Sequence, residues 1–426
     1  MKSAGSNSPV WHPFTQHATA PSPINVASAH GVYLITPEDD MILDAISSWW
    51  VITHGHCHPR IVAAVRAQAE RLDQVIFAGF THEPAEKLAQ ALVELTPDGL
   101  TRVFYSDSGS TAVEVALKMA LGYWRNIGAP RSRIVALEHA YHGDTIGTMS
   151  AGARGVFNAA YEPMLFEVMR LKFPHEGAEQ EALDQLEAIC KSEPVAALIV
   201  EPLILGAGGM LVWKAETLAE MRRICDRHEV LLIADEVMTG WGRTGSLFAC
   251  EQAGIAPDIL CLAKGLTGGH LPLAVTLCSE EIFEAHYSMD RAKTFFHSSS
   301  YTANPIACAA GMANVEIWKE EPVLERVRNL QQMQERRLAR LGSDNMFTNV
   351  RQCGTIAALD LIVKDAGYLA NVGPRLMEFF VGRGILLRPL GNTIYVMPPY
   401  GIDPDQLDSV YAAIAAASAV VQSGGE

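Results

Sequence analysis

Leu231-Leu232-Ile233-Ala234-Asp235-Glu236-Val237 and Leu260-Cys261-Leu262-Ala263-Lys264-Gly265 are the two stretches that decide the fold. Each begins as an apolar run of strand length; the first ends in an acid, Asp235, and the second in an amine, Lys264. Continuous apolar runs are typical of strands buried on both faces of a parallel sheet. Because open α/β sheets bind their ligands at the carboxyl ends of the strands, the two stretches predict a ligand site with one carboxylate and one amine.

Helix candidates alternate with apolar strand candidates through the middle of the chain. The helix candidates cover residues 61–72, 83–95, 111–127 and 216–228, and the strand candidates cover residues 101–105, 134–137 and 195–201. That alternation predicts an α/β fold with a wound, mostly parallel sheet. Because 426 residues exceed one ordinary core, we expect a large domain over residues 49–310. A smaller α+β domain would combine residues 1–48 with residues 311–426.

The composition favours a folded enzyme. Hydrophobic residues make up 49% of the chain and charged residues 19%, which leaves ample material for a core. A net charge of −15 argues against a nucleic-acid surface, because phosphate neutralisation requires clustered Lys and Arg. No apolar run reaches the roughly 20 residues that span a bilayer, and residues 1–6 lack a hydrophobic signal region. We therefore expect a cytoplasmic protein, with no membrane partner, that acts on small molecules.

Pyridoxal phosphate is a cofactor that needs both a carboxylate and an amine. Asp235 would face its ring nitrogen and keep the ring protonated, so that it accepts electrons from the substrate. Lys264 would condense with its aldehyde and later carry a proton between substrate and cofactor. Taken singly, either residue is better explained as a solvated strand end. The pair, with glycine-rich segments after each, favours the cofactor.

Gly109 and Ser110 precede the helix candidate at residues 111–127. Backbone amides at a helix start, unobstructed at a glycine and joined by a hydroxyl, can hold a phosphate group. A serine at this place is also a common helix cap. The lysine and aspartate pair is what favours phosphate binding here.

The segments Asp235 to Gly245 and Ala263 to Leu266 resemble the cofactor motifs of the class III aminotransferases, a branch of fold type I. The resemblance implies a large cofactor-binding domain, pyridoxal 5′-phosphate as cofactor, and a homodimer with shared active sites. It also implies roles for individual residues. The catalytic residues would be Lys264, Asp235 and Tyr141, and the cofactor-binding residues would be Gly109, Ser110, Tyr141, Asp235, Val237, Lys264, Ser299 and Ser300.

Three of these cofactor assignments carry their own alternatives. Tyr141 would stack on one face of the pyridine ring and Val237 on the other, if Val237 shares the strand face of Asp235. A loop aromatic and a core valine are the plain alternatives. In the resembling family, the loop at residues 296–305 reaches the phosphate of the neighbouring subunit. Whether Ser299 or Ser300 makes that contact stays open.

A second set of motifs resembles the branch of the family that acts in biotin synthesis. These motifs are Trp11 to Gln16, Ser47 to Trp50, Leu387 to Asn392 and Tyr395 to Tyr400. The resemblance implies amino transfer from S-adenosyl-L-methionine to 8-amino-7-oxononanoate. The substrate-binding residues would be Trp49, Trp50, Tyr141, Asp144 and Arg388.

Two of these residue types suit those substrates on physical grounds. Arg388, in a strand-like run, presents a planar guanidinium that can hold a carboxylate through two hydrogen bonds; a surface arginine is the alternative. Two adjacent tryptophans cannot both enter one core from a strand, so Trp49 or Trp50 would line a pocket. An indole suits both an alkyl chain and a sulfonium cation, and an aromatic corner between lobes is the alternative.

Several alternatives remain at this stage. Phe14 stands where well-known relatives carry tyrosine, so lysine is a second possible amino donor. Another class III enzyme acting on ornithine, 4-aminobutyrate or an aliphatic amine is the nearest rival, and a noncatalytic homologue is the rival from another class. The histidines at residues 54–58 are interpreted as a glycine- and histidine-rich turn rather than a metal site, because no second ligand pair has suitable spacing.

Overall fold

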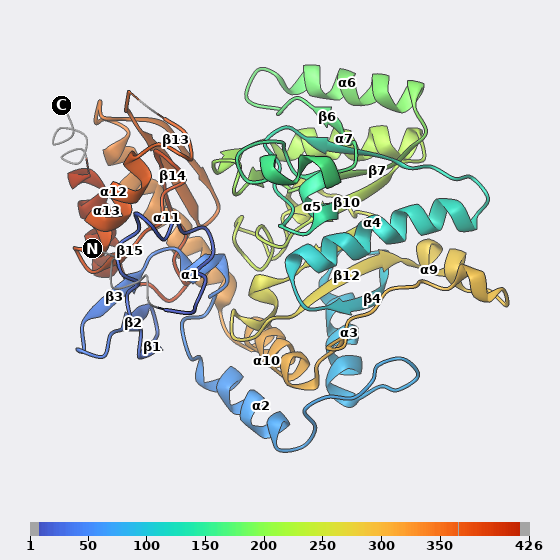
Figure 1. The fold of residues 1–426 in the computed structure, drawn as a ribbon, viewed down its shortest axis with the longest axis horizontal. Coiled ribbons are helices and arrows are strands. Elements are labelled where there is room, and N and C mark those ends of the chain that lie inside the picture. The colour runs from blue at the N-terminus through green and yellow to red at the C-terminus, as the bar shows by residue number, and fades with distance from the viewer. Residues whose placement is uncertain (1–7, 365, 418–426) are drawn as a thin grey trace.

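A seven-stranded sheet forms the centre of the larger lobe (Figure 1), and the computed structural model describes residues 8–364 and 366–417. Its order is β4-β12-β11-β10-β7-β5-β6, and β12 alone runs opposite to the other strands. The strands are β4 Leu100–Ser106, β5 Arg133–Leu137, β6 Met169–Leu171, β7 Val195–Val200, β10 Leu231–Asp235, β11 Ile259–Leu262 and β12 Ala274–Ser279. The predicted α/β class with a mostly parallel sheet is confirmed. Residues 1–6, where we noted no signal region, lie outside the described residues.

Helices cover both faces of this sheet because its strands are apolar on both sides. Leu231 and Ile233 of β10 pack in the same core cluster as α4, whereas Leu232 packs on the opposite face. The helices on the first face are α4 Gly109–Asn126, α5 Ile146–Ala151 and α9 Glu280–His286. Those on the other face are α3 Glu83–Leu95, α6 Glu179–Ser192, α7 Ala215–Arg227 and α10 Pro305–Glu320. By the two-residue period of the strand, Asp235 falls on the α4 face.

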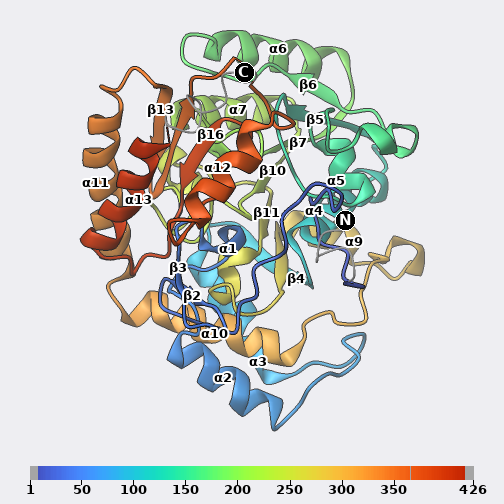
Figure 2. The same cartoon turned by 60° about the vertical axis from the view of Figure 1, so that its left-hand side comes forward.

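The smaller lobe combines both ends of the chain. β1 Ser28–His30, β2 Tyr33–Ile35, β3 Met41–Asp44 and β15 Ile385–Leu386 form one sheet, in which β15 pairs with β3 in parallel. β13 Phe347–Cys353, β14 Ile356–Leu361 and β16 Thr393–Val396 form another. Figure 2 shows α11 Val323–Leu341, α12 Val372–Val381 and α13 Pro404–Ala416 gathered beside it. The domain boundaries at residues 48 and 310 stay a prediction.

Short elements complete the chain. They are α1 Ser47–Trp50, α2 Pro59–Ala69, the hairpin β8 Ile204–Leu205 with β9 Leu211–Val212, α8 Cys250–Ala253, and the 3-10 turns η2 Ala159–Met164, η3 Lys264–Thr267 and η4 Arg291–Lys293. Among the described helices, none has the length and apolar character that crossing a membrane requires.

Trp49 and Trp50 lie in α1, a kinked turn with positive φ at Trp50. Two local expectations from the sequence are wrong. Arg388 lies between β15 and β16, outside any strand. Val237 follows the end of β10 at Asp235, so the alternation of side chains along a strand does not determine which way it points. In both cases the strand ends while the sequence stays apolar.

Candidate active site

A cavity of about 610 Å³ opens at the carboxyl ends of β10 and β11, a volume typical of small-molecule sites. It brings together residues from both lobes. The sequence-predicted residues that line it are Trp49, Trp50, Gly109, Ser110, Tyr141, Asp144, Asp235, Val237, Lys264 and Arg388. Residues that we did not single out also line it, notably His142, Phe157, Glu201, Tyr368 and Tyr395.

Asp235 is the last residue of β10 and is buried. Its Oδ2 lies 2.7 Å from Nδ1 of His142, and its Oδ1 accepts a hydrogen bond from the Val237 amide at 3.2 Å. His142 is itself buried and follows Tyr141 in the loop after β5. These contacts orient the Asp235 carboxylate, which can therefore hold a cationic ring nitrogen that enters the cavity.

Lys264 begins η3 directly after β11. Its Nζ lies 4.6 Å from the centre of the Trp50 ring, and the Trp50 indole donates to the Tyr395 hydroxyl at 3.0 Å. Burial lowers the pKa of Lys264 to about 8, and the Asp235 carboxylate opposes this shift. Among the described residues, no carboxylate lies within 4.0 Å of Nζ. A substantial fraction of the amine is therefore uncharged, and nucleophilic, near neutral pH.

The first turn of α4 faces the same cavity. Ser108 caps the helix, since its hydroxyl accepts from the Thr111 amide at 3.2 Å and the Thr111 hydroxyl accepts from the Ser108 amide at 2.9 Å. Ser108, and not Ser110, is therefore the helix cap. Gly109 and Ser110 line the cavity. A Cβ atom on Gly109 would lie 2.6 Å from Cγ1 of Val237, so only glycine allows this approach. The helix start forms a small cradle suited to an anion.

Tyr141 is held by Glu201, a residue that our sequence reasoning missed. Glu201 follows β7, and its Oε1 accepts from the Tyr141 amide at 2.9 Å while its Oε2 accepts from the Gly206 amide at 3.0 Å. Burial raises the pKa of Glu201 to about 7. Burial and the Asp144 carboxylate also hold the pKa of Tyr141 above its ordinary value, so its hydroxyl stays protonated. The strand-end rule that selected Asp235 would also have found Glu201.

Aromatic side chains and one arginine surround the mouth of the cavity. Trp49 contacts Phe14 edge-on at 5.6 Å between ring centres, and the Arg388 guanidinium lies 5.2 Å from the Trp49 ring. Phe157 contacts Phe14 at 5.9 Å and Tyr368 at 4.5 Å. Phe157 and Tyr368 lie in loops with no periodic pattern, so sequence reasoning did not identify either residue.

Ser299 and Ser300 do not line this cavity. The Ser299 amide donates to the Thr302 hydroxyl at 2.9 Å, and the Ser300 carbonyl accepts from the Gln74 amide side chain at 3.0 Å. Their predicted contact involves a second subunit, so it stays a prediction.

The histidines in the turn at residues 54–58 have different hydrogen-bond partners: His54 bonds to Asn314 and His56 bonds to Asp44.

The chain is similar along nearly its whole length to proteins of one family. The family model described as aminotransferase class-III matches residues 14–417. A curated protein from Synechococcus elongatus, named adenosylmethionine-8-amino-7-oxononanoate aminotransferase, is 48% identical, with 95% of this chain and 97% of that protein covered. A protein of the same name from Geobacter sulfurreducens is 39% identical, with 94% and 93% covered.

Solved structures agree with this match. The crystal structure of adenosylmethionine-8-amino-7-oxononanoate aminotransferase from Methanocaldococcus jannaschii has a TM-score of 0.92 and 33% identity, with 97% of each chain covered. An amine transaminase from an uncultivated Pseudomonas species, solved with pyridoxal phosphate bound, has a TM-score of 0.92 and 32% identity, with 98% of this chain and 100% of that chain covered. The motif resemblance is thus confirmed, and the chain belongs to the class III aminotransferases.

Proposed function

We propose that this protein transfers an amino group from S-adenosyl-L-methionine to 8-amino-7-oxononanoate, which gives 7,8-diaminononanoate, in two successive half-reactions. The observation that carries the proposal is the cavity in which Lys264 and Asp235 meet Arg388 and the two adjacent tryptophans. Relatives of up to 48% identity bear the name of this reaction. Family membership indicates pyridoxal 5′-phosphate as the cofactor.

The residues around the cavity fit that cofactor. Pyridoxal phosphate supplies an aldehyde that condenses with amines and a ring that accepts electrons. Lys264 would attach the cofactor through its uncharged amine, and Asp235 would hold the ring nitrogen protonated. The cradle that Gly109 leaves beside Val237 would take the phosphate on the backbone amides of Gly109 and Ser110. Tyr141 and Val237 would flank the ring.

Lys264 would also move the proton that the reaction requires. Once a substrate amine has displaced it, its amine is free to take a proton from the substrate carbon and return it to the cofactor side. The Trp50 ring, 4.6 Å from Nζ, would shield one side of this amine from water, which favours proton transfer between the reacting groups. The pKa of about 8 suits a base that works near neutral pH.

The mouth of the cavity would hold the two substrates in turn. Arg388 would bind a substrate carboxylate through its guanidinium. Trp49 and Trp50 would provide apolar walls for the alkyl chain of 8-amino-7-oxononanoate. Asp144, which lines the same cavity next to Tyr141, would face the substrate.

The absorbance band of the lysine-bound cofactor tests the amino donor. Purified holoenzyme would be mixed separately with S-adenosyl-L-methionine, lysine and 4-aminobutyrate in single-turnover experiments. We expect S-adenosyl-L-methionine alone to bleach the band and 8-amino-7-oxononanoate to restore it. Bleaching by lysine alone would change the donor, bleaching by 4-aminobutyrate alone would assign another class III reaction, and a band that no amine bleaches would indicate a noncatalytic homologue.

The pKa of Lys264 predicts how the apoprotein captures its cofactor. Because only the uncharged amine attacks the aldehyde, the capture rate should rise with pH, reach its midpoint near 8 and then level off. Asp235→Asn removes a negative charge that raises the pKa of Lys264, so this variant should have a lower midpoint. Stopped-flow absorbance measures both midpoints. A wild-type midpoint above about 10, the ordinary lysine value, would contradict the buried amine.

We also propose that the protein is a homodimer in which the loop of Ser299 and Ser300 reaches the partner's phosphate site. Asn304 and Gln74 join this loop to the segment at residues 73–81 through hydrogen bonds of 2.9–3.0 Å. Large apolar side chains are exposed on these two segments: Ile76 is 64%, Phe80 62%, Phe296 71% and Tyr301 64% exposed. Several large exposed apolar side chains on two adjoining segments are typical of a protein interface.

Light scattering coupled to gel filtration tests the dimer. We expect the wild type at twice the chain mass of 46.3 kDa. Ile76→Glu should give monomers with little activity, because it buries a charge in the interface. Leu324→Glu, at an exposed apolar position on α11, is the matched control and should stay dimeric. An active wild-type monomer would refute the shared site.

A further inference from the structure

We propose that Phe14, Trp49, Phe157 and Tyr368 form an aromatic cage that recognises the sulfonium cation of the amino donor. The inference rests on the proposed function and adds to it the group that selects the donor. All four side chains line the cavity, together with Arg388. They come from the N-terminal segment, α1, the loop after α5 and the loop before α12.

The rings form a continuous series of edge contacts. Their centres are 5.6 Å apart between Trp49 and Phe14, 5.9 Å between Phe14 and Phe157, and 4.5 Å between Phe157 and Tyr368. Aromatic faces attract cations within about 6 Å, most strongly where water is excluded. Ammonium ions with bulky apolar substituents are bound in this way, and a sulfonium, which has no N–H group to hydrate, has the same requirements.

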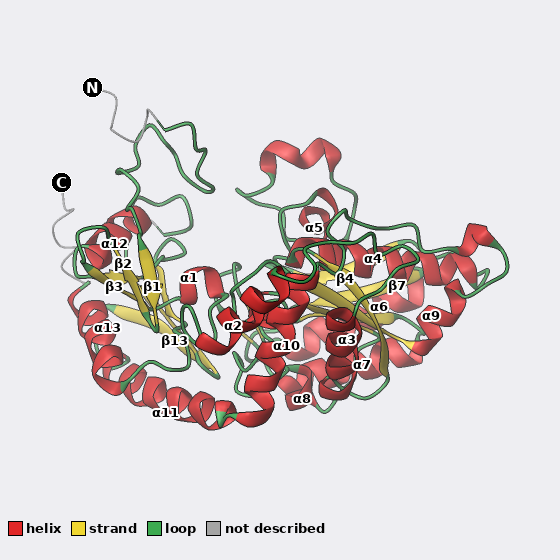
Figure 3. Ribbon diagram, turned by 90° about the horizontal axis from the view of Figure 1, so that it is seen from below, coloured by secondary structure: helices red, strands yellow, loops and turns green. Residues whose placement is uncertain are grey.

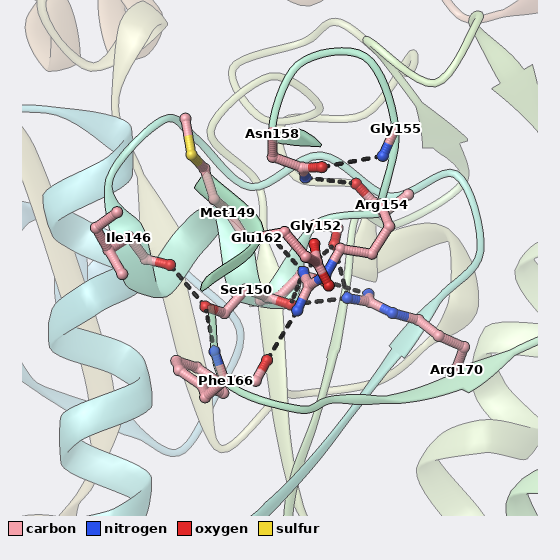
Figure 4. Close-up of polar contacts among 12 residues, drawn as sticks. Ile146, Met149, Ser150, Gly152, Arg154, Gly155, Asn158, Glu162, Phe166 and Arg170 are labelled. Carbon is pink, nitrogen blue, oxygen red and sulfur yellow. Dashed lines mark hydrogen bonds and ion pairs between the residues drawn. The ribbon is translucent and has the colours of Figure 1, made fainter. Parts of the chain in front are cut away.

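The ring of Phe157 stands on a braced loop. Figure 4 shows two guanidiniums, Arg154 and Arg170, converging on the carbonyl groups at the end of α5. Both donate to the Ser150 carbonyl, at 3.0 and 2.7 Å, and Arg154 also donates to the Phe166 carbonyl at 2.8 Å.

The neighbouring residue completes this brace. The Asn158 side chain donates to the Ala153 carbonyl at 2.7 Å and accepts from the Gly155 amide at 2.9 Å, which closes the turn before Phe157. Figure 3 shows the loop next to the N-terminus on the same side of the molecule as α5. Phe157 therefore meets Phe14 as part of a preorganised wall.

Tyr368 owes its place to a glycine. A Cβ atom on Gly391, where φ is +63°, would lie 2.3 Å from the Gly367 carbonyl oxygen. Only glycine therefore lets the loop of Tyr368 approach the turn that carries Arg388. The loop that carries Tyr368 and the turn that carries Arg388 therefore pack directly against each other.

The charges at the mouth match a zwitterion whose cation has no hydrogen-bond donors. Among the described residues, no carboxylate pairs with Arg388, whose contacts include the Phe14 carbonyl at 3.4 Å, the Met377 sulfur at 3.9 Å and the Trp49 ring at 5.2 Å. Arg388 can therefore take the α-carboxylate of the donor, and two methylene groups beyond the α-carbon bring the sulfonium to the rings. A lysine ammonium is strongly hydrated and needs acceptors, which rings alone do not supply.

The acids that line the cavity bond to other groups. Asp235 bonds to His142, Glu201 bonds to the amides of Tyr141 and Gly206, Asp107 accepts from Thr111, and Asp144 interacts with Tyr141. Each of these acids therefore has a partner outside the cage. The rings, and not a carboxylate, are thus what meets the cation.

The test compares S-adenosyl-L-methionine with S-adenosylhomocysteine, which lacks one methyl group and the positive charge. Calorimetry on holoenzyme with the cofactor in its pyridoxamine form gives both dissociation constants without turnover. We expect wild-type protein to prefer the sulfonium, and Phe157→Leu to reduce that preference about fivefold while the affinity for the thioether stays within about twofold. Phe157→Trp should retain the preference, and Tyr161→Leu, an exposed aromatic on η2, is the control.

Other outcomes would overturn the cage. If Phe157→Leu weakens both ligands equally, or weakens neither, the rings form only an apolar wall. Tyr368→Leu tests the same charge preference should Phe157→Leu fail to fold. A wild-type protein whose band S-adenosyl-L-methionine bleaches, but which has no preference for the sulfonium, overturns the cage and leaves the proposed function intact. If S-adenosyl-L-methionine neither binds to the wild-type protein nor bleaches its absorbance band, the proposed function itself is overturned.

Discussion

Lys264→Ala is expected to reduce turnover by at least about 10⁴-fold, because one change removes both the attachment point of the cofactor and the group that carries the proton. Alanine removes the contact of the lysine amine with the Trp50 ring but breaks no ion pair among the described residues. We therefore expect the variant to fold. The remaining rate comes from cofactor that the other cavity residues hold. Steady-state kinetics with both substrates measures the loss.

Mass spectrometry provides a second measurement on the same variant. Borohydride treatment should fix the cofactor onto the peptide that contains Lys264 in wild-type protein, and onto no peptide in Lys264→Ala. Added small primary amines should restore part of the lost rate, since they can replace the missing base in the space that the side chain leaves. Lys319→Ala, an exposed residue paired with Glu94 on the surface, is the control. Turnover in Lys264→Ala within about tenfold of wild type would refute the assignment.

Asp235→Asn is expected to reduce turnover by about 10³-fold, the second largest effect. Asparagine keeps the shape of the side chain, but it cannot hold a protonated ring nitrogen by charge. The pair between Asp235 and His142, at 2.7 Å, loses its charge at the same time. Asp235→Glu should recover part of the rate, because the negative charge returns in a shifted position. Rates of the two half-reactions, followed by absorbance, measure the effect.

The adjacent acid provides the matched control for Asp235. Glu236 is fully buried, and its carboxylate accepts from the amides of Ala249 at 2.6 Å and Cys250 at 2.9 Å. Glu236→Gln should therefore lower the free energy of unfolding by about 1–3 kcal/mol, because the amide group replaces one of the two accepting oxygens with an NH₂ group and so breaks one buried hydrogen bond. Turnover per folded molecule should stay unchanged. A larger catalytic loss from Glu236→Gln than from Asp235→Asn would reverse our assignment of the two acids.

Local pattern accounts for much of what was predicted correctly. β10 and β11 are continuous apolar runs, and such a run can be buried only where both faces of a sheet are covered. The alternation of strand and helix then requires a parallel sheet, and parallel strands bring their carboxyl ends to one edge. Local sequence was therefore enough to predict that Asp235 and Lys264 line one cavity.

The same reasoning failed where the chain turns while staying apolar. Val237 and Arg388 were each assigned from the pattern of a strand, yet Val237 lies in a turn beside Gly109 of α4 and Arg388 lies in a turn beside the Trp49 ring. Burial makes a turn apolar just as it makes a strand apolar, so hydrophobicity alone does not distinguish them. These residues nevertheless line the cavity, because it is formed where such turns meet.

The sequence by itself determined the central strands, the edge at which they end, and the two charged residues, Asp235 and Lys264, to which we assign the chemistry. The tertiary structure decided which distant residues meet around them: Arg388 reaches the Phe14 carbonyl 374 positions away, and Phe157 meets both Phe14 and Tyr368. The physical reason is that side-chain periodicity is set within one element by backbone geometry, whereas contacts between loops depend on how separate elements pack. The reacting groups were therefore evident from local sequence, and the selectivity of the mouth was not.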